Sequence, residues 1–420
     1  MLSSRAGRMA TAGLWTAMMT WGCAPAVPIA SDRDETDGLR ELPSDTRYVE
    51  TEPNDIFEQA ESILGVDRFE ISGAIGVGLP WDNDVFLIGS AAAGDRIQIE
   101  IETSRGADVV LGLLDSAHRL LAYTDPWSPT SGPNSVDLVI REDVSALYIV
   151  MGTRSASAFA RPYTVQVDIA RGTSVLGYQP QIIVLSFLGA EDVRIASRQP
   201  VDVPAFDAAA IDPSFTGQTE AIADLIVDRV RDHFAGLDVE IYRDSDTGIP
   251  PQNRSVVYFG TYDPRLLGLA ENIDPFNTNT EQAAILFTDT FALFSVLYPT
   301  VDEMAQVLAN VASHEVGHLL GLRHTADPDD LMDVTATASR MLRKQWFLLA
   351  DLHESVLPAG RQDSPTLLAW TLGGSLLPPP AYLAMEQSIS RSVPDLASEQ
   401  DFHVPRHLLS TSGCGDDCDW

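Results

Sequence analysis

Three of the chain's eight histidines lie in one short segment, SHEVGHLLGLRHT, which runs from Ser313 to Thr325. His314 and His318 are four residues apart, so on a helix both imidazoles project from the same face, one turn apart. Two imidazoles placed in this way can bind one metal ion together, and Glu315 can reach a water molecule at that metal without being a ligand. The H-E-x-x-H spacing is typical of two zinc ligands and a general base.

The segment continues to Gly321 and His324, which completes the longer pattern H-E-x-x-H-x-x-G-x-x-H. Glycine suits the left-handed residue that ends a helix, and such a turn would bring His324 back as a third ligand. The alternative is a buried helix whose histidines are only hydrogen-bonded. That alternative is favoured for a lone histidine, but three histidines with the glutamate and the glycine favour a metal site.

A helix is expected here for independent reasons. Thr300 and Glu303 have the T-x-x-E spacing of a capping box. The apolar residues that follow recur at helical spacing: Met304, Val307, Leu308, Val311 and Leu319. The pattern predicts a helix from Val301 to about Leu320, with the histidines in its last turns.

These residues resemble the metzincin zinc endopeptidases, which place a methionine turn beneath the metal. Met332 follows His324 after eight residues, and the pair Leu331 and Met332 is similar to the matrixin branch. The resemblance implies one catalytic Zn²⁺ held by three histidines and water, because Val334 stands where some metzincins carry a zinc-linked tyrosine.

The resemblance also implies hydrolysis of peptide bonds in protein or peptide substrates. Zinc lowers the pKa of water toward about 7 and polarises the substrate carbonyl. Glu315 then takes the proton of the water as the general base and passes it to the leaving amine. Two alternatives stay open: a surface-binding lipoprotein with an inactive peptidase-like domain, and a zinc amidohydrolase that acts on small substrates.

The elements around this motif predict an α+β metzincin-like domain over residues 180–360, with a twisted sheet, the zinc helix and the methionine turn. QIIVLSFLG, LDVEIYRD and RSVVYFGT are expected strands, and TGQTEAIADLIVDRVRDHF is an expected helix. The metzincin resemblance also implies an edge strand above the cleft, near Ala284 to Asp289, to which an extended peptide would add. A C-terminal helix is expected over residues 339–357, and a Pro-rich acidic tail over residues 361–420.

Residues 49–170 read as an all-β sandwich, because short alternating runs are separated by Gly, Asp, Ser and Pro. This region resembles the bacterial pre-peptidase C-terminal domain in EPND (Glu52 to Asp55), DNDVF (Asp82 to Phe86) and YTVQV (Tyr163 to Val167). The resemblance implies binding or positioning without chemistry of its own. Carboxylates suit Ca²⁺, and Asp55, Asp82 and Asp84 are candidates, although turn capping is the favoured interpretation. A linker is expected over residues 171–179.

The N-terminal residues 1–22 are expected to be a signal peptide. Arg5 and Arg8 precede a mostly apolar stretch that is too short to span a bilayer. TWGC ends at Cys23 and resembles a bacterial lipoprotein signal, which implies export and lipidation of Cys23; ordinary secretion is the alternative. Residues 23–48 are expected to be an acidic flexible tether.

Cys414 and Cys418 are the two other cysteines. In an oxidising compartment a local disulfide between them is expected, and metal binding is the alternative. The chain has 420 residues, which favours two domains, and its net charge of −33 disfavours nucleic acid and anionic membrane surfaces as partners. Contact with a membrane is therefore expected only through a lipid anchor, and the oligomeric state is not indicated.

Overall fold

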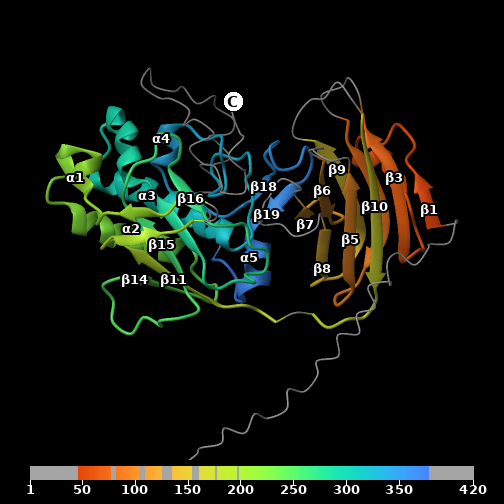
Figure 1. Cartoon of the computed structure of the whole chain (residues 1–420), viewed down its shortest axis with the longest axis horizontal. Coiled ribbons are helices and arrows are strands. Elements are labelled where there is room, and N and C mark those ends of the chain that lie inside the picture. The colour runs from red at the N-terminus through yellow and green to blue at the C-terminus, as the bar shows by residue number, and fades with distance from the viewer. Residues whose placement is uncertain are drawn as a thin grey trace, which may run out of the picture. The chain divides into compact units, whose positions relative to one another are not determined.

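The computed structural model describes residues 46–76, 82–103, 109–124, 135–153, 160–175, 177–195 and 198–377. All of them belong to one compact unit, Leu42–Trp420. Within these ranges a β region precedes an α/β region (Figure 1). No helix in the described part of the chain is long and apolar enough to cross a membrane. The predicted signal peptide, Cys23, Cys414 and Cys418 lie outside the described residues.

The β region consists of two five-stranded sheets. The first has the order β1-β3-β10-β5-β8, and the second has the order β2-β4-β9-β6-β7. The strands of the first sheet are β1 (Arg47–Val49), β3 (Arg68–Ile75), β10 (Arg161–Ala170), β5 (Arg96–Thr103) and β8 (Ser135–Val139). Those of the second are β2 (Glu61–Ser62), β4 (Asp84–Ala91), β9 (Val144–Thr153), β6 (Val109–Leu114) and β7 (Leu120–Thr124). A short 3₁₀ helix, η2 (Phe57–Gln59), precedes β2.

One hydrophobic core joins the inner faces of these two sheets. From Arg96 to Glu102 of β5 the residues alternate between exposed and buried, which is the pattern of a strand with one solvated face. Ile99 and Val165 from the first sheet share the core with Phe86, Leu111 and Ile149 from the second. The region is therefore sandwich-like, as its sequence predicts. β1 pairs with β3 and begins inside the segment that we predicted to be a flexible tether.

The α/β region is built on a five-stranded sheet with the order β14-β11-β15-β17-β16. Its strands are β11 (Gln181–Ser186), β14 (Val239–Arg243), β15 (Ser255–Phe259), β16 (Gly268–Ala270) and β17 (Ala283–Leu286). Neighbouring strands are parallel except for β16, which runs antiparallel to β17. The expected edge strand near Ala284 is therefore wrong: β17 is internal, and β16 forms that edge.

Two long helices, α2 (Thr219–His233) and α3 (Val301–Leu319), cover one face of this sheet. Ile222, Ile226 and Val230 of α2 are buried at the spacing that its sequence predicts. The opposite face packs Ile285 and Leu269 against the hairpin of β12 (Ala190–Val193) and β13 (Val201–Val203). Shorter helices α1 (Ala208–Ile211), η3 (Pro213–Phe215) and η4 (Thr288–Leu297) connect these elements.

After the methionine turn the structure differs from the predicted helix over residues 339–357. Only α4 (Ala338–Met341) is helical there, and the chain continues as β18 (Leu349–Asp351). The predicted tail is also ordered at its start, because β19 (Arg361–Asp363) pairs with β18 and leads into α5 (Ser364–Leu372). Leu368 and Leu372 of α5 are fully buried in the core of the α/β region. The last helix of the fold therefore comes later in the chain than expected.

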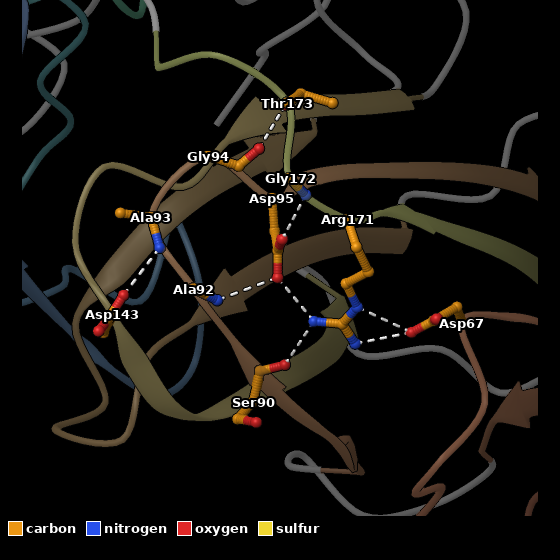
Figure 2. Close-up of polar contacts among 10 residues, drawn as sticks. All are labelled: Asp67, Ser90, Ala92, Ala93, Gly94, Asp95, Asp143, Arg171, Gly172 and Thr173. Atoms are coloured by element: carbon orange, nitrogen blue, oxygen red, sulfur yellow. Dashed lines mark hydrogen bonds and ion pairs between the residues drawn. The ribbon is translucent and has the colours of Figure 1, made fainter.

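The first residues after β10 are bound to the sandwich instead of leaving it freely. Figure 2 shows Asp95 accepting hydrogen bonds from the backbone of Ala92 (3.0 Å) and Gly172 (2.9 Å) and from Arg171 (2.7 Å). Burial opposes ionisation of Asp95, but these donors outweigh it and lower its pKa. Arg171 also pairs with Asp67 at 2.7 Å, so the beginning of the predicted linker is anchored.

Candidate metal centre

The helix that carries the histidines begins and ends where its sequence indicates. Thr300 accepts a hydrogen bond from the Glu303 backbone, and the Glu303 side chain accepts one from the Thr300 backbone at 2.8 Å, which is a complete capping box. At the other end, Gly321 has a φ of +92°, and a Cβ there would lie 2.5 Å from the backbone of Pro275. The amides of Gly321 and Leu322 bond back into the last turn, a Schellman ending that turns the chain toward His324.

The structure brings the three predicted ligands together. Their nitrogens lie within 4.8 Å of one another, and the ring centroids are 4.6 to 5.3 Å apart. His314 donates from Nδ1 to the carbonyl of Leu331 at 2.7 Å, and His318 donates from Nδ1 to the carbonyl of Leu322 at 2.9 Å. Each bond fixes the tautomer that leaves Nε2 without a hydrogen, which is the form that binds a metal.

This arrangement fits a cation between the rings. The Nε2 atoms of His314 and His318 are 3.0 Å apart, so two lone pairs face each other across that distance. Protonation would relieve the repulsion, but burial lowers the pKa of His314 to about 4 and that of His318 well below its usual range. A zinc ion accepts lone pairs from neutral imidazoles, so the donor set suits it.

Glu315 lies beside the histidines and against the edge strand β16. Its side chain is fully buried, and burial raises its pKa well above the usual range, opposed in part by a backbone hydrogen bond from Ala270. A Cβ on Gly268 would lie 2.3 Å from Oε1 of Glu315. The carboxylate therefore occupies the space above a glycine, between the zinc helix and the strand at the sheet edge. Gly268 was not recognised in the sequence, where it is one of 29 glycines.

Met332 lies under the metal centre, as the metzincin resemblance implies. It is fully buried, and its sulfur would be 2.6 Å from a Cβ on Gly317 of α3. Glycine inside a helix is unfavourable by about 1 kcal/mol, so its presence at position 317 is explained by the close approach of the thioether. Gly317 is a second supporting residue that our sequence analysis did not single out.

The loop that carries His324 is held by a buried carboxylate. Asp330 accepts hydrogen bonds from the Thr325 hydroxyl (2.7 Å) and from the Leu348 backbone (3.1 Å). Burial raises the pKa of Asp330 to about 7, although these hydrogen bonds oppose the rise. The Thr325 amide also donates to the carbonyl of Met332 at 2.9 Å, which ties the ligand loop to the methionine turn.

Residues 252–347 match the matrixin family model. The match includes α3, the three histidines and Met332, so this region is a zinc metallopeptidase-like domain of the metzincin kind. It covers less than half of the chain. No match was found among curated proteins.

Two solved structures have low overall similarity to the chain. The pre-peptidase C-terminal domain of a collagenase from Bacillus anthracis is 16% identical, and the match covers 26% of this chain and 94% of that one at a TM-score of 0.20. An archaemetzincin from Methanopyrus kandleri is 15% identical, and the match covers 41% and 90% at a TM-score of 0.24.

A second cluster of possible metal ligands lies in the sandwich. Carboxylate oxygens of Glu52, Asp82 and Asp84 are within 4.8 Å of one another. The hydroxyl of Tyr163 is 2.6 Å from Asp84 and 2.7 Å from Glu50, so one proton serves two carboxylates. Burial, together with the neighbouring Glu50 and Asp82, raises the pKa of Asp84 to about 9.

Asn54 is part of the same corner of the sandwich. It is fully buried, and its side-chain oxygen and nitrogen have no hydrogen-bond partner among the described residues. Its backbone amide donates to Glu52 at 3.2 Å, and its carbonyl accepts from the amide of Val85. Of the predicted calcium ligands, Asp82 and Asp84 lie in this cluster, and Asp55 is close enough to contribute to the raised pKa of Asp82, whose largest cause is burial. Glu50, Glu52 and Asn54 were not predicted as ligands.

Proposed function

We propose that the protein is an exported zinc-dependent endopeptidase with Glu315 as its general base. The observation that carries the proposal is the convergence of three imidazoles beside one buried carboxylate, under the edge strand of a sheet. Zinc, when bound by His314, His318 and His324, would supply Lewis-acid polarisation of the substrate carbonyl and of water.

Residues of this chain orient the imidazoles, transfer the proton and position the zinc helix. Leu331 and Leu322 hold two of the imidazoles in the metal-binding tautomer through their carbonyls. Burial raises the pKa of Glu315, which favours its acceptance of a proton from water; as general base it would then pass that proton to the leaving amine. Met332 and Gly317 set the height of the zinc helix above the methionine turn.

Peptide binding would use the outer edge of β16. Within the described ranges β16 pairs only with β17, so its other edge is the place where an extended substrate adds as a further strand. Such pairing uses main-chain hydrogen bonds, which accept many sequences. Glu315 lies against Gly268 and Ala270 of this strand, so a peptide paired there is held beside the base.

The proposal is tested by two substitutions at the centre. Glu315→Gln keeps the size of the side chain but removes the base, so zinc content should stay at the parental level while hydrolysis falls by ~10²–10⁴-fold. His318→Ala removes a ligand, so zinc content and hydrolysis should fall together. Both quantities are measured on the same preparations with an unfolded protein as substrate.

Glu240→Gln is the matched control, because Glu240 is exposed on β14 and away from the histidines. It should keep parental zinc content and rate. Parental hydrolysis by Glu315→Gln would contradict the assignment of the base. Cleavage of small amides without cleavage of any protein would favour the amidohydrolase alternative, and zinc binding without hydrolysis would favour the binding protein.

We also propose that Cys23 is lipidated after removal of residues 1–22, which would anchor the protein to the cell envelope. The support is the basic start, the short apolar stretch and the TWGC sequence. Cys23→Ser should move the protein from the membrane fraction to the soluble fraction. An unchanged distribution, with no lipid mass on the N-terminal peptide, would contradict lipidation.

For the cluster in the sandwich we propose Ca²⁺ as the ligand. The carboxylates of Glu52, Asp82 and Asp84 lie close together near the buried Asn54, whose side-chain amide has no hydrogen-bond partner among the described residues, and oxygen donors of this kind suit calcium. Burial is the largest cause of the raised pKa of Asp84, and the neighbouring Glu50 and Asp82 add to it; a divalent cation bound there would favour the ionised carboxylate.

A further inference from the structure

The sandwich and the α/β region share a small hydrophobic core of their own. Leu352, Val356 and Leu357, which follow β18, are buried in it together with residues from the outer face of the second sheet. Those residues are Val85, Val110, Leu114, Leu120 and Val150. The second sheet is therefore covered on both faces, by its partner sheet and by the segment 352–357.

Two glycines shape this outer face. Gly112 of β6 pairs with Val150 of β9, and Gly152 of β9 pairs with Val110 of β6. A Cβ on Gly112 would lie 2.5 Å from Leu357, and one on Gly152 would lie 2.7 Å from Pro358. Glycine weakens a strand interior and often marks a close approach of another segment. The two positions form a hollow that fits Leu357 and Pro358.

Polar contacts fix the register of this interface. The Arg361 amide donates to the carbonyl of His118 at 2.9 Å, and Arg119 and Arg361 form a parallel bridge. Arg119 donates to Asp115 at 2.7 Å and to Asp363 at 3.0 Å, so one guanidinium joins β19 to the sandwich. Because Asp115 is almost fully buried, the pair is less screened than a surface ion pair.

Residues that follow β18 also hold the loop that carries His324, the third proposed zinc ligand. The Gln362 side chain accepts from the amide of Arg323 at 2.7 Å and donates to its carbonyl at 2.8 Å. The amide of His353 donates to the carbonyl of His324 at 3.1 Å. The sandwich also touches this loop directly, because the Arg323 guanidinium lies 3.9 Å from the ring centroid of Tyr123 at the end of β7.

We propose that the sandwich positions the third zinc ligand, with Tyr123 acting through Arg323 on His324. The inference rests on the proposed zinc site and assigns a role to the sandwich within it. Tyr123 is a positioning residue, since it contacts the residue that precedes the ligand and not the metal site itself. A cation over an aromatic ring is attracted to it, which favours one orientation of the Arg323 side chain and of the loop that carries it.

The test measures the zinc dissociation constant of full-length variants by competition with a chelator. Tyr123→Ala should weaken zinc binding by about tenfold, at the low end of what loss of a supporting contact costs. Tyr123→Phe keeps the ring and should bind zinc as the parent does. Gly152→Val should also weaken zinc binding, because the added side chain would push Pro358 away from the sandwich. Valine suits a strand, so β9 itself should still form.

Tyr298→Ala is the matched control, since Tyr298 is 83% exposed at the end of η4, outside the interface core. A second arm combines Tyr123→Ala with Arg323→Ala. If Tyr123 acts through Arg323, the double variant should bind zinc no more weakly than Arg323→Ala alone. If the losses of zinc affinity in the two single variants instead add up in the double variant, Tyr123 does not act through Arg323.

The outcomes separate this inference from the proposed function. A parent protein that binds no zinc would overturn both. A zinc-binding parent whose Tyr123→Ala and Gly152→Val variants keep the parental dissociation constant would overturn the positioning role alone. Circular dichroism of each variant identifies any that is unfolded, and the Tyr123 pair then decides, because Tyr123 is only partly buried where it packs against the interface core at the end of β7.

Discussion

Gly268 leaves the space that the side chain of Glu315, the proposed base, occupies. The carboxylate of Glu315 lies where a side chain at position 268 would be, 2.3 Å from the ideal Cβ position. Gly268→Ala should therefore push Glu315 out of place, and misplacement by about 1 Å can cost ~10²-fold in rate. Zinc content should not change, because no ligand is touched. The measurement is zinc per chain together with the rate of hydrolysis of an unfolded protein.

Gly177→Ala is the control for that substitution, since nothing lies within 4 Å of an added Cβ at position 177. Its rate and zinc content should equal those of the parent. Parental activity in Gly268→Ala would mean that Glu315 has room to move without loss, and that its position against β16 is unimportant.

Asp84 makes the stability of the sandwich depend on pH. Its pKa is raised in the folded protein to about 9 from about 3.8, so between these values the folded state holds a proton that the unfolded state has lost. The free energy of unfolding should therefore fall as pH rises through this window when no cation is bound. Ca²⁺ should reduce the fall, because it stabilises the ionised carboxylate.

Calorimetric unfolding from pH 5 to pH 9, with calcium and with a calcium chelator, measures this effect. Asp84→Asn cannot ionise and should lose both the pH dependence that Asp84 causes and the response to calcium. A calcium response that survives in Asp84→Asn would contradict the proposed ligand set.

The chemistry-bearing residues could be predicted because they are close in sequence. His314, Glu315 and His318 lie on one helix, and a single glycine turn adds His324. Gly268 belongs to another strand, and nothing in its neighbourhood indicates which side chain it accommodates. A contact between residues that are far apart in the sequence, such as Gly268 and Glu315, can be identified only in the folded structure.

At the scale of elements, the zinc helix is defined by its caps. The capping box at Thr300 satisfies amides that would otherwise lack partners at the start of α3. Thr300→Ala should lower the free energy of unfolding by about 1 kcal/mol and leave zinc content unchanged, because the histidines lie at the far end of the helix. Denaturant unfolding of the metal-free and zinc-loaded protein gives both quantities.

Glu303→Gln is the matched variant for the other half of the box. The amide oxygen of glutamine can still accept the hydrogen bond from the Thr300 backbone, so the loss should be smaller than for Thr300→Ala. Equal stability of Thr300→Ala and the parent would mean that water satisfies these amides equally well.

Other elements depended on tertiary contacts that a local pattern does not contain. After α4, the expected helix over residues 339–357 is replaced by loops and the short strand β18. The Trp346 amide donates to the carbonyl of Asp329, and the Trp346 carbonyl accepts from the amide of Leu331, beside the methionine turn. β16 has only three residues, too few for a pattern. β17 is apolar on both faces, which in retrospect indicates an internal strand.

At the scale of the molecule, the sandwich-like region and the α/β region could both be expected from their sequence patterns. The contact between the two regions could not be predicted, although the apolar sequence VVLGLL in β6 is consistent with it. All six of its residues are buried, which is the pattern of a strand covered on both faces. A fragment that begins near Val175 would expose Leu352, Val356 and Leu357, which are buried against the sandwich in the full chain.

The most direct test of the central claim uses the full-length protein. Zinc per chain and the rate of cleavage of an unfolded protein are measured before chelation, after removal of the metal, and after zinc is returned. We predict about one catalytic zinc per chain, loss of cleavage on chelation and its recovery with zinc. A zinc-loaded protein that cleaves no peptide bond in a broad panel of unfolded proteins would contradict the claim.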